Sequence, residues 1–213
     1  MGVNMNSAVW RTIGQGRDPD NTAQAVGIGL WVFMGVATAL FSLFLLANLM
    51  RMTAQDWWPL SLPWQLWLSS ALLVAGSVSL QWASSHARAG RMPAAQAWLR
   101  LGGACAMGFV LSQLWAWKSL QAVGVLPAGN PAASFFYVLT ALHGLHVLGG
   151  LVGWVVATRA VADAPDASTV AWRIVLCARY WHFLLAVWVA LFVTMAWLTP
   201  DIARFICAPL RII

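Results

Sequence analysis

The sequence contains no glutamate, and charged residues of any kind are scarce. Asp, Glu, Lys and Arg together make up 8% of the 213 residues, all 6 acidic residues are aspartates, and hydrophobic residues account for 61%. A soluble domain carries about 25% charged residues, because these residues cover the surface that faces water. The composition therefore excludes an ordinary soluble domain and indicates an integral membrane protein.

Cysteine is also scarce, and its placement excludes a metal or disulfide framework. The three cysteines are Cys105, Cys177 and Cys207, and the sequence has neither a CxxC pair nor a cluster of Cys and His. Cys105 and Cys177 fall in apolar runs and are expected to be small buried residues. No secretory signal peptide is expected, because residues 1–23 are polar and lack an apolar core.

Basic residues outnumber acidic ones and give a net charge of +6. They lie singly or in pairs between apolar runs, as loop charges do in membrane proteins. This distribution does not favour nucleic-acid binding, which needs a clustered basic surface.

Five long apolar segments fill the chain. A membrane helix needs roughly 20 apolar residues. We therefore expect an all-α, polytopic membrane protein, a bundle of five transmembrane helices, with short loops that make neighbouring helices antiparallel. The helices are expected at about 24–50, 64–85, 98–122, 132–158 and 170–199, between an N-terminal tail of residues 1–23 and a C-terminal tail of residues 200–213.

The loop charges predict the orientation. The side shared by the N-terminal tail and the second and fourth loops carries 7 arginines, whereas the other side carries 4 basic residues. Because basic residues favour the cytoplasmic side, the N-terminus is expected in the cytoplasm and the C-terminus in the periplasm. His86, in the predicted loop 86–97, is expected to be solvated.

Three histidines and one glutamine are expected inside the membrane. His143 and His146 lie on one helix face, His182 lies on the next helix at a similar depth, and Gln113 lies on the third helix. Two interpretations compete. The histidines could hold a haem or metal between facing helices, or all four side chains could form a structural polar cluster of hydrogen bonds across helices. From the chemistry alone, the structural cluster is favoured.

Two residues near the start of the last helix are candidates for lipid contact. Arg179 lies about one turn inside the cytoplasmic end, where its side chain can extend to the interface and bind a lipid phosphate, and Trp181 follows it.

Several motifs resemble subunit III of the haem-copper oxidases. His143-Gly144-Leu145-His146-Val147 resembles the HGxHV helix of that family, and Tyr180-Trp181-His182-Phe183 resembles its YWHF motif. The segment 29–34 is similar to the family's GLWLFL helix start, and Leu68-Ser69-Ser70 to its LxSS segment. The resemblance covers all five expected helices in order and is closest to the five-helix form of the family.

The resemblance implies a non-catalytic subunit with no cofactor of its own. Such a subunit packs beside the catalytic haem-copper subunit I and other oxidase subunits of a bacterial inner membrane, binds phospholipids and supports proton uptake; the haem and copper are expected in the partner. The carboxylates usual in the family are replaced by Ala37, Ala116 and Leu185. A proton-collecting role is therefore doubtful, and a structural and lipid-bearing role is expected.

Three alternatives remain open at the level of sequence. The chain could be the related subunit of a nitric oxide reductase complex. It could be a small membrane cytochrome b that uses His143 or His146 together with His182. A small transporter is disfavoured by the absence of intramembrane carboxylates and of broken helices.

Overall fold

Five α-helices make up most of the described chain. The structure, a computed structural model, describes residues 19–54, 56–58, 60–163, 167–198 and 202. The helices are α2 (Pro19–Met52), α3 (Gln65–Arg88), α4 (Met92–Ala122), α5 (Pro131–Asp163) and α6 (Ala167–Trp197). All five are long and apolar enough to cross a membrane. The expected all-α fold with five spans is confirmed, whereas most of the two predicted tails, with Cys207, lies outside the described residues.

The helices extend further than the apolar runs suggested. The third helix begins at Met92 rather than near residue 98, and the fourth continues to Asp163. Pro93 lies in the first turn of α4, where its missing N–H costs nothing because the first N–H groups of a helix have no partner within it. Hydropathy therefore placed the apolar parts of the helices, but not their polar ends.

The prediction that His86 is a solvated loop residue is wrong. It lies in the last turn of α3 rather than in a loop, and its Nδ1 atom is buried without a hydrogen-bond partner among the described residues. The chain instead turns at residues 89–91. Gly90 has a φ of 73°, a left-handed conformation that glycine adopts without steric cost, and the Arg91 N–H donates to the His86 carbonyl at 2.9 Å.

The connection between α4 and α5 is held by side chains at both of its ends. Asn130 caps α5, because its Oδ1 accepts a hydrogen bond from the Ala132 N–H at 2.9 Å. The Asn130 side chain also donates to the Trp58 carbonyl at 3.0 Å, which ties this turn to the loop before α3. Tyr137 donates to the Val125 carbonyl at 2.9 Å.

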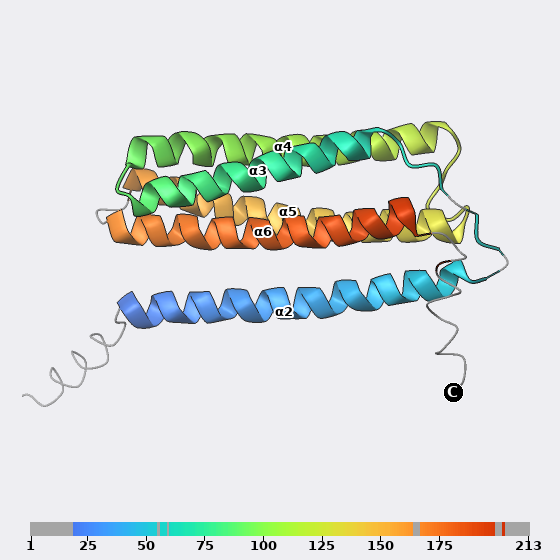
Figure 1. Ribbon diagram of the computed structural model, residues 1–213, viewed down its shortest axis with the longest axis horizontal. Helices are drawn as coiled ribbons and strands as arrows, with labels where there is room; N and C mark the ends of the chain where they lie inside the picture. The colour runs from blue at the N-terminus through green and yellow to red at the C-terminus, as the bar shows by residue number, and fades with distance from the viewer. Residues whose placement is uncertain (1–18, 55, 59, 164–166, 199–201, 203–213) are drawn as a thin grey trace, which may run out of the picture. The chain divides into compact units, whose positions relative to one another are not determined.

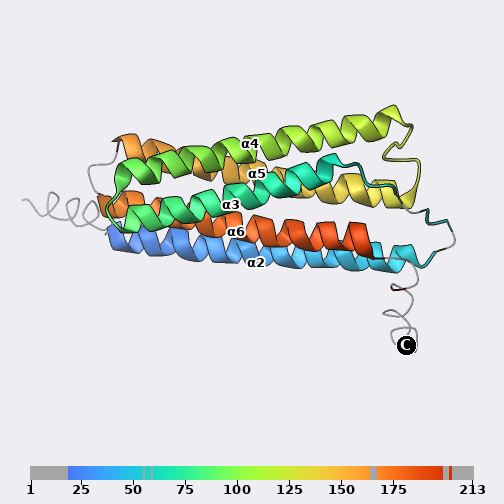
Figure 2. The same ribbon diagram turned by 45° about the horizontal axis from the view of Figure 1, so that its top comes forward.

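The chain divides into two compact units, residues 1–37 and 38–213. In the described part of the first unit, the N-terminal half of α2 exposes large apolar side chains such as Ile28, Trp31 and Val32, as a lipid-facing helix does. In the second unit, α3 contacts α4 and α6, and α5 contacts α4 and α6, so the four helices form a closed ring around one core. Figures 1 and 2 show these four helices running lengthwise beside one another.

Close packing between α3, α4 and α5 depends on small residues. A Cβ atom added at Gly102 would come within 2.7 Å of the Leu80 side chain, and one added at Gly103 would overlap the indole of Trp154. The Trp154 Nε1–H donates to the Leu99 carbonyl at 2.7 Å. In lipid there is little hydrophobic drive between helices, so this close contact and interhelical hydrogen bonding hold them together.

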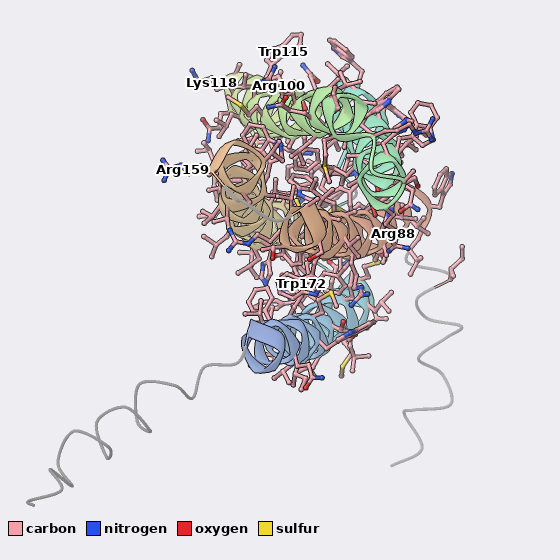
Figure 3. All side chains as sticks on the ribbon, turned by 90° about the vertical axis from the view of Figure 1, so that its left-hand side faces the viewer. Arg88, Arg100, Trp115, Lys118, Arg159 and Trp172 are labelled. Atoms are coloured by element: carbon pink, nitrogen blue, oxygen red, sulfur yellow. The ribbon has the colours of Figure 1, made fainter. Side chains whose placement is uncertain are left out.

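Basic side chains gather at one end of the second unit. Arg88 ends α3, Arg100 lies near the start of α4, and Arg159 lies near the end of α5. Figure 3, which looks along the helices, shows Arg88, Arg100 and Arg159 on the outside of the four-helix ring. The structure thus brings Arg88, Arg100 and Arg159 to one end, and the loop charges had assigned these three arginines to one side of the membrane.

Candidate functional site

His143 lies in an aromatic cage at the centre of the second unit. Its side chain is fully buried. The ring centroid lies 5.1 Å from Trp188 on α6, 5.6 Å from Phe109 on α4 and 6.3 Å from Phe41 on α2. Neither ring nitrogen has a hydrogen-bond partner among the described residues. The expectation that His143 bonds to a neighbouring polar group is therefore wrong, because aromatic rings occupy three of its sides.

His146 lies one turn further along α5 and has a different environment. Its Nδ1 pairs with the carbonyl of Leu142 at 2.8 Å, a bond within its own helix, and its ring lies 5.2 Å from Phe41. The hydroxyl of Tyr180 donates to the His146 carbonyl at 3.0 Å and so links α6 to α5. The one described hydrogen bond of the His146 side chain therefore lies within α5.

His182 joins α6 to α3 at the exposed side of the ring of helices. Its Nδ1 lies 2.5 Å from Ser77 Oγ, and its Nε2 lies 2.9 Å from Gln81 Oε1. Because an amide oxygen can only accept, Nε2 carries the proton that it donates to Gln81, and in the neutral ring Nδ1 accepts from Ser77. Both nitrogens are thus used by α3 rather than by α5.

Gln113 and Trp188 make further polar links to α3. Gln113 Nε2 donates to Ser69 Oγ at 2.8 Å, and Trp188 Nε1 donates to Ser70 Oγ at 2.9 Å. The Oε1 atom of Gln113 is buried without a partner among the described residues. The serines of α3 were visible in the sequence as small residues. Their role as acceptors could not be predicted, because it depends on which helix faces them.

The contacts divide the four predicted polar residues among different interfaces. His182 bonds to α3, Gln113 bonds to α3 from α4, His146 bonds within α5, and His143 is enclosed by rings. A haem held by His143 and His182 would need both rings to face one cavity, whereas His143 is enclosed by rings and His182 is committed to two α3 side chains. Among the described residues, no three His, Cys, Asp or Glu side chains are grouped so as to hold a metal ion.

The two candidates for lipid contact have opposite environments. Trp181 is fully buried, and its ring packs against Gly150 of α5, where an added Cβ would lie 3.4 Å from the indole. The prediction that Trp181 contacts lipid is therefore wrong, because the residue faces into the ring of helices. Arg179 is exposed on the N-terminal half of α6, and its contact with lipid stays a prediction.

The positions where the family usually has carboxylates are apolar here. Ala116 on α4 is fully buried, Leu185 on α6 is partly buried, and Ala37 lies in α2. Within the described residues, the five spans contain no Asp or Glu. These helices therefore offer no carboxylate that could take up or release a proton inside the membrane.

Comparison with known proteins extends the resemblance over the whole helical region. The family model described as "Cytochrome c oxidase subunit III" matches residues 27–199, which include all five helices apart from the start of α2. The chain belongs to the cytochrome c oxidase subunit III family. It is therefore a subunit III of a haem-copper oxidase complex embedded in a membrane, and the nitric oxide reductase and cytochrome b alternatives are not favoured.

Similar proteins support the same family across nearly their full length. A "Probable cytochrome c oxidase subunit 3" of Nocardia farcinica is 29% identical over 184 residues, covering 82% of this chain and 89% of the relative. Proteins with the same description from Mycobacterium leprae and Mycobacterium tuberculosis are 27% and 29% identical and cover 81% of this chain. His143 and His182 both lie within the residues that the family model matches.

Proposed function

We propose that this subunit stabilises the catalytic haem-copper subunit and holds phospholipids around it, without conducting protons itself. The observation that carries this proposal is the absence of any carboxylate from the five described spans. Without such a group, no residue in these helices can exchange protons as an intramembrane carboxylate does. The haem and copper belong to the partner, since the family's subunit III is the cofactor-free one.

The exposed surface supports a role in packing against other subunits and lipids. Large apolar side chains on α5 face outward, among them Leu145, Leu148 and Val152. The exposed Arg179 is the candidate for a lipid phosphate, because it lies near the basic end of α6. We further propose that this basic end faces the cytoplasm of a bacterial inner membrane and that the electron donor of the complex is cytochrome c, as the names of the relatives suggest.

Purification of the affinity-tagged chain from membranes of its native host, in a mild detergent, tests the assignment to the complex. We expect a haem-containing catalytic subunit and phospholipid to co-purify with it. The chain separated from that partner is expected to show no stoichiometric Soret band. Purification without a haem-containing partner, or a full Soret band in the isolated chain, would contradict the proposal.

A second experiment tests the absence of a proton-conducting role. The intact complex is compared with a complex that lacks this subunit and with one that carries Ala37→Glu and Leu185→Asp. Loss of the subunit is expected to reduce stability and lipid content. The restored carboxylates are expected to leave the rate of proton uptake unchanged, and an increase would show that proton transfer through this subunit matters.

A further inference from the structure

A partly open cavity of about 190 Å³ lies at one end of the second unit. Its wall is formed by the end of α2, the loop that follows, the start of α5 and the end of α6. The wall includes Asn48, Met52, Trp57, Phe136 and Met195. None of the described residues in the wall carries a charge, so the cavity favours an uncharged group.

Asn48 supplies the side-chain amide of this wall. The residue is 3% exposed, and its side chain has no hydrogen-bond partner among the described residues. An asparagine amide offers two N–H donors and one acceptor oxygen, and a buried donor without a partner is costly. A molecule that enters the cavity with a carbonyl oxygen can accept a hydrogen bond from this amide.

The cavity lies near the ends of its helices. Asn48 is about 6 Å before the end of α2 at Met52, and Phe136 is about 8 Å after the start of α5 at Pro131. Figure 1 shows the start of α5 and the end of α6 at the same end of the second unit. The loop after α2 exposes Trp58, and tryptophan is enriched where membrane meets water. The cavity is therefore expected at the depth where lipid headgroups join their acyl chains.

The size and lining of the cavity suit one part of a lipid. Sites that enclose a whole drug-sized ligand measure about 300–1,000 Å³, which exceeds the 190 Å³ found here. Arg51 lies beside Met52, but its guanidinium donates to Asp56, so its charge is already balanced. Met52 and Met195 have flexible side chains that adapt to an irregular apolar partner. These features favour an acyl chain with its ester group over a phosphate.

We propose that the cavity binds the ester end of one acyl chain of a membrane phospholipid. The Asn48 N–H donates to the ester carbonyl, the first methylene groups pack against Met52, Phe136 and Met195, and the headgroup stays outside. This inference rests on the proposed role in holding phospholipids. It adds a site at the end of α5 opposite to Arg159.

Two lipids that differ only in the ester carbonyls test the hydrogen bond. The intact oxidase complex, depleted of loosely bound lipid in detergent, is titrated with dioleoylphosphatidylcholine or with its ether analogue, which lacks both carbonyls. We expect the ether lipid to need an about fivefold higher concentration for the same rise in Tm, because one hydrogen bond is lost. Equal concentrations would overturn the proposal.

Asn48→Leu assigns that difference to the cavity, because it keeps a side chain of similar size and removes the amide. In this variant the two lipids are expected to act at equal concentrations. Ser42→Leu is the control, because Ser42 is exposed on the same helix and lies outside the wall. The control should keep the fivefold difference. A fivefold difference that persists in Asn48→Leu would overturn the proposal.

A cryo-electron microscopy map of the unmodified complex in dioleoylphosphatidylcholine nanodiscs decides even if Asn48→Leu fails to assemble. We expect acyl-chain density that passes Phe136 and places an ester carbonyl within hydrogen-bond distance of Asn48. An empty cavity, a quinone or a side chain of another subunit at this position would overturn the proposal.

The phospholipid content of the complex separates this site from the proposed function. If removal of the whole subunit loses no phospholipid, the proposed lipid-holding function fails. If removal loses phospholipid but the Asn48→Leu complex retains all of it, only the cavity site fails. The expected result is the loss of about one phospholipid per complex in Asn48→Leu and none in Ser42→Leu, measured by quantitative mass spectrometry.

Discussion

His182 on α6 and Ser77 on α3 are joined through Nδ1 and Oγ at 2.5 Å, and the same ring reaches Gln81 at 2.9 Å. One histidine thus links two turns of α3 to α6. Interhelical hydrogen bonds in membranes average about 0.6 kcal/mol and reach about 1.7 kcal/mol. His182 thus makes two described bonds from α6 to α3, and Trp188 adds a third through Ser70.

His182→Phe is expected to destabilise the subunit by about 1–2 kcal/mol, because it removes both bonds and leaves the buried Ser77 hydroxyl without its partner. The measurement is the Tm of the purified complex, together with the rate at which subunit III dissociates in detergent. In a double-mutant cycle, Ser77→Ala should cost less in the His182→Phe background than alone. Additive effects would show that the two residues are not coupled.

Gly103→Ala is expected to destabilise the bundle by about 1–3 kcal/mol, because the new Cβ would overlap the indole of Trp154 and displace its bond to the Leu99 carbonyl. Gly153→Ala is the control, because no atom lies within 4 Å of its added Cβ and alanine favours a helix. Thermal unfolding of both variants checks the prediction. A neutral Gly103→Ala would mean that Trp154 can move aside.

Trp188→Phe is expected to cost about 0.5–1.5 kcal/mol, because it keeps an aromatic ring against Phe109 and His143 but removes the N–H that bonds to Ser70. Trp188→Ala also empties the core and should cost about 3–5 kcal/mol. The free energy of unfolding of both variants is measured in the same detergent. The difference between the two values separates the contribution of the hydrogen bond from that of the packing. Equal costs would contradict this division.

Asp56 in the loop after α2 is expected to titrate below the usual range of an aspartate. Its pKa is lowered because the Arg51 guanidinium donates hydrogen bonds to both carboxylate oxygens, at 2.6 Å and 2.5 Å. Because its folded-state pKa lies below the unfolded value of about 3.9, ionised Asp56 stabilises the folded state at pH values above about 3.9. This stabilisation is lost as the pH falls through the folded-state pKa. A carboxyl ¹³C NMR titration should show the low pKa, and Arg51→Gln should return it to the ordinary range. An unchanged pKa in that variant would exclude Arg51 as the cause.

Hydropathy alone determined the class of this protein. With 8% charged residues, the chain has too few charged side chains to cover a surface that faces water. Its five long apolar runs therefore predict five membrane helices. The HGxHV and YWHF motifs then indicated the family, and the match over residues 27–199 confirmed it. The polar ends of α4 and α5 were not predicted. A membrane helix can continue past its apolar residues into the interface between membrane and water, so the end of an apolar run does not mark the end of the helix.

Only the tertiary structure decided what each polar side chain does. The sequence placed His143 and His182 at similar depths, but depth does not fix the direction in which a side chain points. The rotation of α6 turns His182 to the serine and glutamine of α3, and it turns Trp181 inward rather than to lipid. Packing around α5 enclosed His143 among aromatic rings. A polar residue's partners depend on how neighbouring helices are rotated and offset, and those quantities are set by the contacts of the whole bundle.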